Sequence, residues 1–153
     1  MKVYDLKLAR KKIQAFCSYQ DRCHQEVIKK LKSWGLLDES IDMLLGELIE
    51  HHFLNEERFS RNFSRGKFRI KKWGRMKISL ELKRRGVHQT CINMGLTEID
   101  EEDYFHTLLA LLKKKDAMEL ELNSIKRKAK LIRYLSSRGF EFSLIKIAFE
   151  TLK

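Results

Sequence analysis

Three residues near the N-terminus, Cys17, Cys23 and His24, have side chains that can bind a metal ion. A structural zinc site needs four ligands, and no second cluster of cysteine or histidine completes the set. Cys23 also precedes Val27 by four residues and Leu31 by eight, which places all three on one face of a helix. We therefore predict that Cys23 packs in an apolar core and that the chain binds no metal.

The sequence supports a catalytic site no better than it supports a metal site. His51 and His52 are adjacent and lack the His-Glu-x-x-His spacing that brings two imidazoles and a base together on a helix. Glu56 and Glu57 are also adjacent, so on a helix they point about 100° apart, and a role in capping the helix start explains them. No glycine-rich phosphate loop is present. The sequence predicts a binding protein that needs no cofactor and is not an enzyme.

Positive charge is concentrated in one part of the chain. The formal net charge is +11, and residues 58–85 hold twelve lysines and arginines but a single acid, Glu81. A face selected only for solubility normally mixes both signs, so an unmixed run favours an anionic partner. The candidate contact residues are Arg58, Arg61, Arg65, Lys67, Arg69, Lys71, Lys72, Arg75 and Lys77.

A helix start predicted near Gly74 lies inside this basic run. Bases are unfavourable at the positive end of a helix dipole, and free backbone N–H groups surrounded by bases would receive a phosphate or a carboxylate. Phe68 and Trp73 lie among the bases. Phe59 and Phe68 both belong to the helix predicted before Gly74, and Phe68 points to the side opposite Phe59. Phe68 could therefore stack on a nucleobase or insert into a partner, or it could pack against a neighbouring repeat. The same alternatives hold for Trp73.

An internal repeat determines the predicted fold. Gly35, Gly86 and Gly139 are 51 and 53 residues apart, and each has apolar residues eight and four positions before it and one, six and ten positions after it. This spacing predicts helix, glycine turn, helix, and a further helix precedes each pair. We predict an all-α chain of three tandem three-helix repeats that resemble helix-turn-helix units and form an elongated or curved molecule. The predicted repeats are residues 1–51, 52–97 and 98–153.

Local signals place some of the helix ends. Asn55 is predicted to cap the first helix of the second repeat, and Thr97 with Asp100 fits a capping box for the first helix of the third. The apolar residues that mark the first helix of the second repeat are Phe59, Phe63 and Ile70.

The cellular location is predicted from what the chain contains. Charged residues interrupt the N-terminal segment 1–16, and no apolar run approaches the roughly 20 residues of a membrane span. Three cysteines without a disulfide spacing suit a reducing compartment. We expect a cytoplasmic, monomeric protein.

The middle of the chain resembles the central motif of the RecX family of bacterial recombination regulators. Residues 53–59 read Phe-Leu-Asn-Glu-Glu-Arg-Phe, and the match continues through Phe63, Lys67, Lys72, Gly74, Ile78, Glu81, Leu82, Arg85, Gly86 and Val87. His52 stands where the motif has glycine, and Ser60 where it has alanine. The resemblance implies tandem three-helix repeats and binding to RecA and its nucleoprotein filament. It also implies modulation, typically inhibition, of RecA ATPase and strand exchange in recombination, DNA repair and the SOS response, with some affinity for DNA phosphate.

Two other functions are weighed against a RecA regulator. Leu82, Gly86 and Ile92 share the spacing of the turn in DNA-reading helix pairs, which favours direct DNA binding, but the candidate reading helix, residues 88–94, carries no lysine or arginine. A basic amphipathic membrane binder is disfavoured because the apolar positions are needed for the cores of the repeats.

Overall fold

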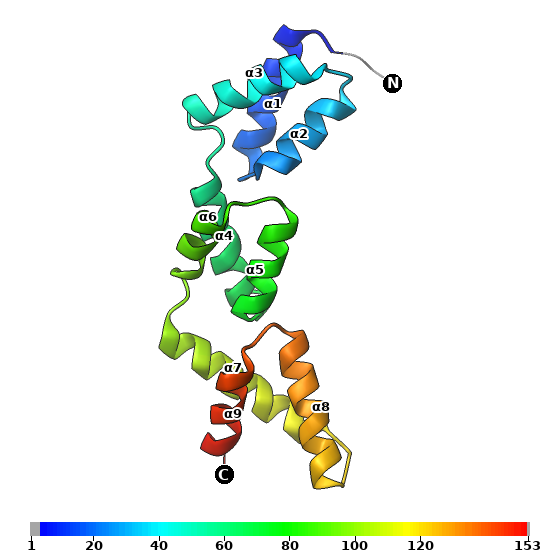
Figure 1. Ribbon diagram of the computed structural model, residues 1–153, viewed down its shortest axis with the longest axis vertical. Coiled ribbons are helices and arrows are strands. Elements are labelled where there is room, and N and C mark those ends of the chain that lie inside the picture. The colour runs from blue at the N-terminus through cyan, green and yellow to red at the C-terminus, as the bar shows by residue number, and fades with distance from the viewer. Residues whose placement is uncertain (1–3, 153) are drawn as a thin grey trace. The chain divides into compact units, whose positions relative to one another are not determined.

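The computed structural model describes residues 4–152, which form nine α-helices and no strand (Figure 1). The prediction of an all-α chain is confirmed. No helix within the described residues is long and apolar enough to cross a membrane. The helices are α1 Leu6–Tyr19, α2 His24–Ser33, α3 Asp38–Glu50, α4 Glu56–Arg69, α5 Arg75–Arg84, α6 Gln89–Leu96, α7 Glu101–Met118, α8 Ser124–Ser137 and α9 Phe142–Thr151.

The three glycines of the repeat end helices as predicted. Gly35, Gly86 and Gly139 have φ angles of 78°, 77° and 98°, and each lies two residues after the last residue of a helix. The apolar residues aligned around them are at most 3% exposed at three of the predicted positions. These residues are Val27, Ile78 and Leu131, then Leu31, Leu82 and Leu135, then Ile41, Ile92 and Ile145. The repeated helix–glycine–helix pattern therefore corresponds to a repeated fold.

The contacts between residues divide the described part of the chain into two compact units. Unit 1 comprises the chain up to Asn62 together with Leu82–Gly95, and unit 2 comprises Phe63–Glu81 together with the chain from Leu96 onward. The borders of these units fall inside α4, α5 and α6. The predicted repeat boundaries after residues 51 and 97 remain predictions.

In unit 1, helices α1, α2 and α3 pack against one another. Cys23 is fully buried, which confirms its predicted packing role, and it lies at the N-cap of α2, where its backbone N–H donates to the Glu26 carboxylate at 3.3 Å. The side chains of His51 and His52 are exposed. The core of this part of unit 1 consists of Ala9, Ile13, Cys17, Val27, Leu31, Ile41, Leu44, Leu48 and Leu54.

Burial should make the core thiols of unit 1 slow to react. Burial raises the pKa of the Cys17 thiol from 9.0 to about 11, and it also raises the pKa of Cys23. The thiolate is the reactive form, so at pH 8 Cys17 should hold about 100-fold less of it than an ordinary cysteine. In a Cys91→Ser variant, Ellman's reagent should therefore react at least about 100-fold more slowly with the native protein than with the protein in urea. Rapid reaction of both thiols in the native protein would contradict their burial.

In unit 2, helix α7 packs against both α8 and α9. Tyr104 of α7 is fully buried, and its ring lies 5.7 Å from that of Phe68 and 5.1 Å from that of Phe140. These three rings join the end of α4, the start of α7 and the turn before α9. Rings that meet at tilted angles over such distances contribute about 0.5–1.5 kcal/mol per pair beyond the area that they bury.

The helix ends confirm one predicted cap and correct another. The Asn55 carboxamide accepts the backbone N–H of the residue three positions on, as predicted. The cap of α7 is Asp100, whose carboxylate accepts a backbone N–H three residues on at 3.0 Å, so the predicted box beginning at Thr97 is wrong. Ile70 was expected on the buried face of α4, but it follows the last residue of the helix and is 78% exposed.

His52, which stands where the family motif has glycine, has a backbone conformation that favours glycine. Its φ angle is 62°, in the left-handed region. The turn after α3 therefore places a residue with a side chain in a left-handed conformation, which lowers the free energy of unfolding by about 1 kcal/mol or more.

Candidate partner-binding surface of α4 and α5

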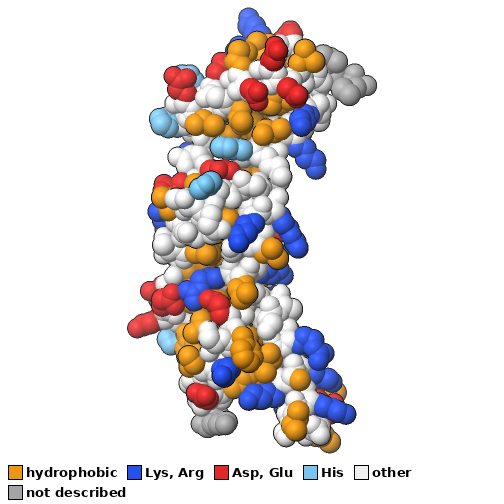
Figure 2. Space-filling view, viewed as in Figure 1, with side chains coloured by type: hydrophobic (Ala, Val, Ile, Leu, Met, Phe, Trp, Pro, Cys, Tyr) orange, Lys and Arg blue, Asp and Glu red, His pale blue; other side chains and the backbone are white. Residues whose placement is uncertain are grey.

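Three arginines of α4 in the basic run, Arg58, Arg61 and Arg65, have carboxylate partners within the molecule. The pairs of Arg58 and Arg65 join α4 to other parts of the chain, whereas Arg61 pairs within α4, and in each case the positive charge is balanced locally. Lysine and arginine side chains lie beside carboxylates at several places on the face shown in Figure 2. The pairs are Arg58–Asp21 at 2.8 Å, Arg61–Glu57 at 3.8 Å and Arg65–Glu98.

Arg75 is the most enclosed arginine of the run, with a side chain that is 21% exposed. Its guanidinium contacts Glu101 and lies 2.8 Å from Glu141, and it covers the Tyr104 ring at 4.1 Å. Partial burial opposes the charge of Arg75, but the hydrogen bond to Glu101 and the charge of Glu141 outweigh it and raise the pKa of Arg75. The role of Arg75 as a partner contact stays a prediction, and its charge is already balanced within unit 2.

The start of α5 was predicted to expose backbone N–H groups to a phosphate or carboxylate ligand. In the structure these donors are satisfied within unit 2, so the prediction of an anion site here is wrong. The unfavourable bases at this helix start are compensated by Glu101 and Glu141. The hydrogen bonds run from Gly74 N–H to the Arg138 carbonyl at 2.7 Å, from Arg75 N–H to the Tyr104 hydroxyl at 2.9 Å, and from Met76 N–H to the Gly139 carbonyl at 2.9 Å.

Two glycines make this docking of α5 possible. A Cβ atom added to Gly74 would lie 2.2 Å from the carbonyl carbon of Gly139, and one added to Gly139 would lie 2.4 Å from the Cβ of Lys77. No pair of non-bonded carbon atoms tolerates such a distance. The backbones of the two turns therefore meet directly, and both positions require glycine.

The two aromatic residues of the basic run have different environments. Phe68 is 7% exposed and lies against Tyr104, so packing between repeats is the correct alternative and stacking on a base or insertion into a partner is wrong. Trp73 is half-buried and meets the Phe63 ring edge-on at 6.5 Å. The ammonium groups of Lys67 and Lys77 lie 4.9 Å and 4.5 Å from the Trp73 ring centre.

The turn between α4 and α5 is rigidly held although its side chains are exposed. Lys72 has a φ angle of 58°, and its ammonium group donates to the Arg69 carbonyl at 2.8 Å. The Arg138 guanidinium donates to the carbonyls of Lys71 and Lys72 from the other side. A cationic side chain that begins from a fixed backbone loses less entropy when it binds.

Five predicted contact cations have no carboxylate partner among residues 4–152. Arg69, Lys71 and Lys72 are exposed, and Lys67 and Lys77 flank the Trp73 ring. No cluster of three or more histidine, cysteine or acidic side chains suited to a metal ion occurs in the same described range. We call the group formed by Lys67, Arg69, Lys71, Lys72, Trp73 and Lys77 the cationic surface. It is the part of the predicted site that the structure leaves available for an anionic partner.

Comparison with known proteins identifies the family. Two sequence models match, described as the second three-helix domain of RecX over residues 55–96 and the third three-helix domain of RecX over residues 101–149. The regulatory protein RecX of Prosthecochloris aestuarii is 30% identical over 148 residues, which cover 97% of this chain and 95% of that protein. The regulatory protein RecX of Lactobacillus johnsonii is 28% identical over 138 residues, 90% of this chain, but the match spans only 51% of that longer protein.

A solved structure supports the same fold. The crystal structure of RecX from Lactobacillus salivarius superposes with a TM-score of 0.87 at 19% sequence identity and covers 96% of each chain. At this identity the similarity establishes the tandem helical fold alone. The two domain matches and the full-length relative add the sequence relationship. Together they show that the chain belongs to the RecX family of regulatory proteins.

Proposed function

We propose that this chain binds RecA and its nucleoprotein filament in the cytoplasm as a monomer, and mostly inhibits RecA ATPase and strand exchange during homologous recombination and DNA repair. Membership of a family of regulatory proteins supports this proposal. A filament of protein on DNA offers both acidic side chains and phosphates, so a compact group of unbalanced cations suits it.

The observation that carries the proposal is the contrast within the basic run. Arg58, Arg61, Arg65 and Arg75 each have a carboxylate partner, whereas the cations of the cationic surface have none among the described residues. An unpaired cation retains its full attraction for an external anion. We therefore assign the contact to the end of α4 and the start of α5, while these four arginines serve the fold.

Charge reversal at the cationic surface should weaken the inhibition of RecA. In the triple variant Lys67→Glu, Lys71→Glu, Lys77→Glu, three attractions become repulsions, and the concentration needed to inhibit RecA ATPase on single-stranded DNA by half should rise at least about tenfold. The matched control reverses three exposed lysines of α1 and α2, Lys11, Lys29 and Lys32, and carries the same net charge. Circular dichroism should show that both variants are folded. Equal inhibition by the two triple variants would reject this location of the contact.

Direct DNA binding predicts a different result from the same proteins. Helix α6, the candidate reading helix, has no lysine or arginine, so DNA would be held mainly through phosphates. If the five cations neutralised five phosphates, the logarithm of the affinity for double-stranded DNA would fall with the logarithm of salt concentration at a slope near −4.5. Such a slope, lost in the Lys67, Lys71 and Lys77 triple variant, together with no inhibition of RecA ATPase by the wild-type protein, would favour the direct DNA-binding alternative over the proposal.

A further inference from the structure

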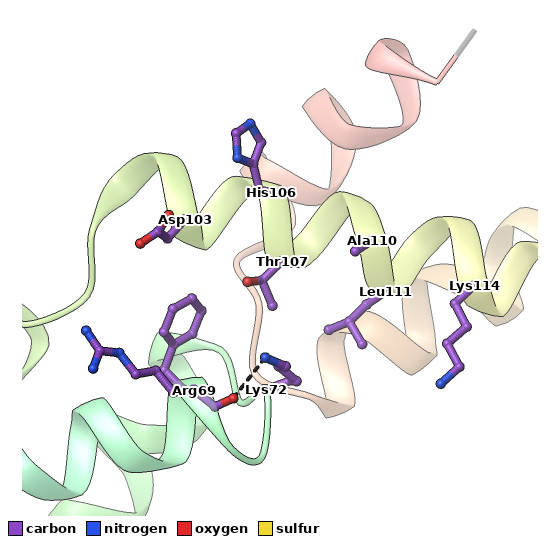
Figure 3. Close-up of a pocket in the computed structure, with 9 residues that line it drawn as sticks. Arg69, Lys72, Asp103, His106, Thr107, Ala110, Leu111 and Lys114 are labelled. Atoms are coloured by element: carbon purple, nitrogen blue, oxygen red, sulfur yellow. Dashed lines mark hydrogen bonds between the residues drawn. The ribbon is translucent and has the colours of Figure 1, made fainter.

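The end of α4 and one face of α7, both within unit 2, border an open hollow of about 550 Å³ (Figure 3). Part of its wall is apolar: Phe68 comes from α4, and Ala110 and Leu111 come from α7. Thr107 and Leu111 point from α7 toward the α4 side of the hollow, as the close-up shows. An apolar concavity of this size accommodates a large side chain or a small ring system.

The charged residues around the hollow are mostly positive. Arg69 lines it from the end of α4, Lys72 from the turn that follows, and Lys114 from α7, against a single acid, Asp103. Arg69, Lys72 and Lys114 are all exposed and have no carboxylate partner among the described residues. A ligand that fits this hollow therefore carries an apolar group together with negative charge.

The packing of Phe68 distinguishes between two kinds of anionic ligand. A nucleobase would need an open aromatic face to stack on, but Phe68 is 7% exposed and its ring is packed on Tyr104. Trp73, the half-buried aromatic of the cationic surface, is not part of the lining. An apolar side chain needs only a surface of carbon atoms, which Ala110 and Leu111 supply. The hollow therefore suits a peptide better than single-stranded DNA.

We propose that this hollow binds an acidic peptide segment of a partner protein that carries one large apolar side chain. The apolar side chain fills the space between Phe68 and Leu111, and the carboxylates of the segment pair with Arg69, Lys72 and Lys114. The inference rests on the proposed function, since the segment would belong to the protein that this chain regulates. It adds a specific anchor to the general attraction of the cationic surface.

Binding of a defined peptide tests the hollow separately from RecA. The probe is a fluorescein-labelled peptide of sequence Asp-Glu-Asp-Phe-Glu-Asp-Glu-Gly, followed by fluorescence anisotropy. The test variant is Ala110→Glu, which fills the hollow and adds negative charge, and the matched control is Ala117→Glu, two turns further along α7 and outside the lining. Both alanines are exposed, so both variants should fold. Ala110→Glu should weaken peptide binding at least about tenfold, and Ala117→Glu less than about twofold.

Two further probes decide what the hollow recognises. The same peptide with alanine in place of phenylalanine should bind about tenfold more weakly, because its apolar anchor is missing. Equal binding of the two peptides, or equal effects of the two alanine variants, would overturn the inference. The inference would also be overturned if the Ala110→Glu variant bound an eight-nucleotide oligo-dT more weakly than the wild-type protein does, but bound the peptide equally well.

The failures of the two proposals can be told apart. If the peptide does not bind but the wild-type protein inhibits RecA ATPase, the inference about the hollow is wrong and the proposed function stands. If the peptide binds and RecA is not inhibited, the proposed function is wrong, and the hollow remains an acidic-peptide site whose partner is another protein.

Discussion

Alanine at Gly139 or at Gly74 is expected to lower the free energy of unfolding by about 4 kcal/mol, the largest effect of any single substitution proposed for this chain. Each new Cβ would lie within 2.6 Å of a backbone atom, which cannot rotate away. Gly139 adds a second penalty, because its φ angle of 98° is unfavourable for alanine. Separating the two turns to relieve the clash would also break the hydrogen bonds that cap α5.

Urea unfolding followed by circular dichroism measures this effect, and Gly66→Ala is the matched control. Gly66 lies inside α4, and a Cβ there would meet no atom within 4 Å. Since alanine is a better helix former, Gly66→Ala should raise the stability by about 0.5–1 kcal/mol. If Gly74→Ala and Gly139→Ala were as stable as the wild-type protein, the direct contact of the two turns would be disproved.

Arg75→Ala is expected to lower the free energy of unfolding by about 2–3 kcal/mol. The substitution leaves the partly buried Glu141 carboxylate without its main counter-charge and uncovers the Tyr104 ring. The 21% and 28% exposure of the two side chains places the effect below that of a fully buried pair. The stability is again measured by urea unfolding.

A double-mutant cycle identifies the cause of this loss. If the pair with Glu141 is responsible, Glu141→Gln should add little further destabilisation once Arg75 is alanine. Lys71→Ala is the comparison for an exposed cation without a carboxylate partner, and it should change the stability by less than about 0.5 kcal/mol. A similarly small effect of Arg75→Ala would favour the role of Arg75 as a partner contact.

Most of the fold could be predicted because its signals are local. The helical spacing of apolar residues around Gly35, Gly86 and Gly139 depends only on neighbours within about ten positions, and the left-handed glycine turns follow from it. The cap at Asn55 is equally local. Ile70 was misplaced because the helical spacing was extended past Arg69, where the chain turns through the left-handed Lys72.

The candidate site was predicted less well because its charges are balanced by distant residues. Arg58 pairs with Asp21, 37 positions earlier, and Arg75 pairs with Glu141, 66 positions later. A count of charges along the sequence finds the excess of positive charge in residues 58–85. It cannot show that carboxylates from distant parts of the chain neutralise some of these charges in the folded protein. The bases near Gly74 did mark an unusual helix start, yet the compensating partners come from the third repeat, about which no local pattern carries information.

The same distinction applies to Phe68 and to the hollow beside it. The helical spacing correctly indicates that Phe68 points away from Phe59, but the group that covers it, Tyr104, lies on another helix. The hollow combines the end of α4 with a face of α7 that begins more than thirty residues later. Its sequence signal is a few separate basic and small residues, which are common on exposed helical faces.

The meeting of Gly74 with Gly139 limits how this protein could exchange parts with its relatives. A hybrid gene that joined the first two repeats to a third repeat from another species would keep α5 docked only if the incoming turn also brought a residue without a side chain and carbonyls in the same places. The two glycines must therefore be inherited together, and a change at one position cannot be rescued by a change at the other.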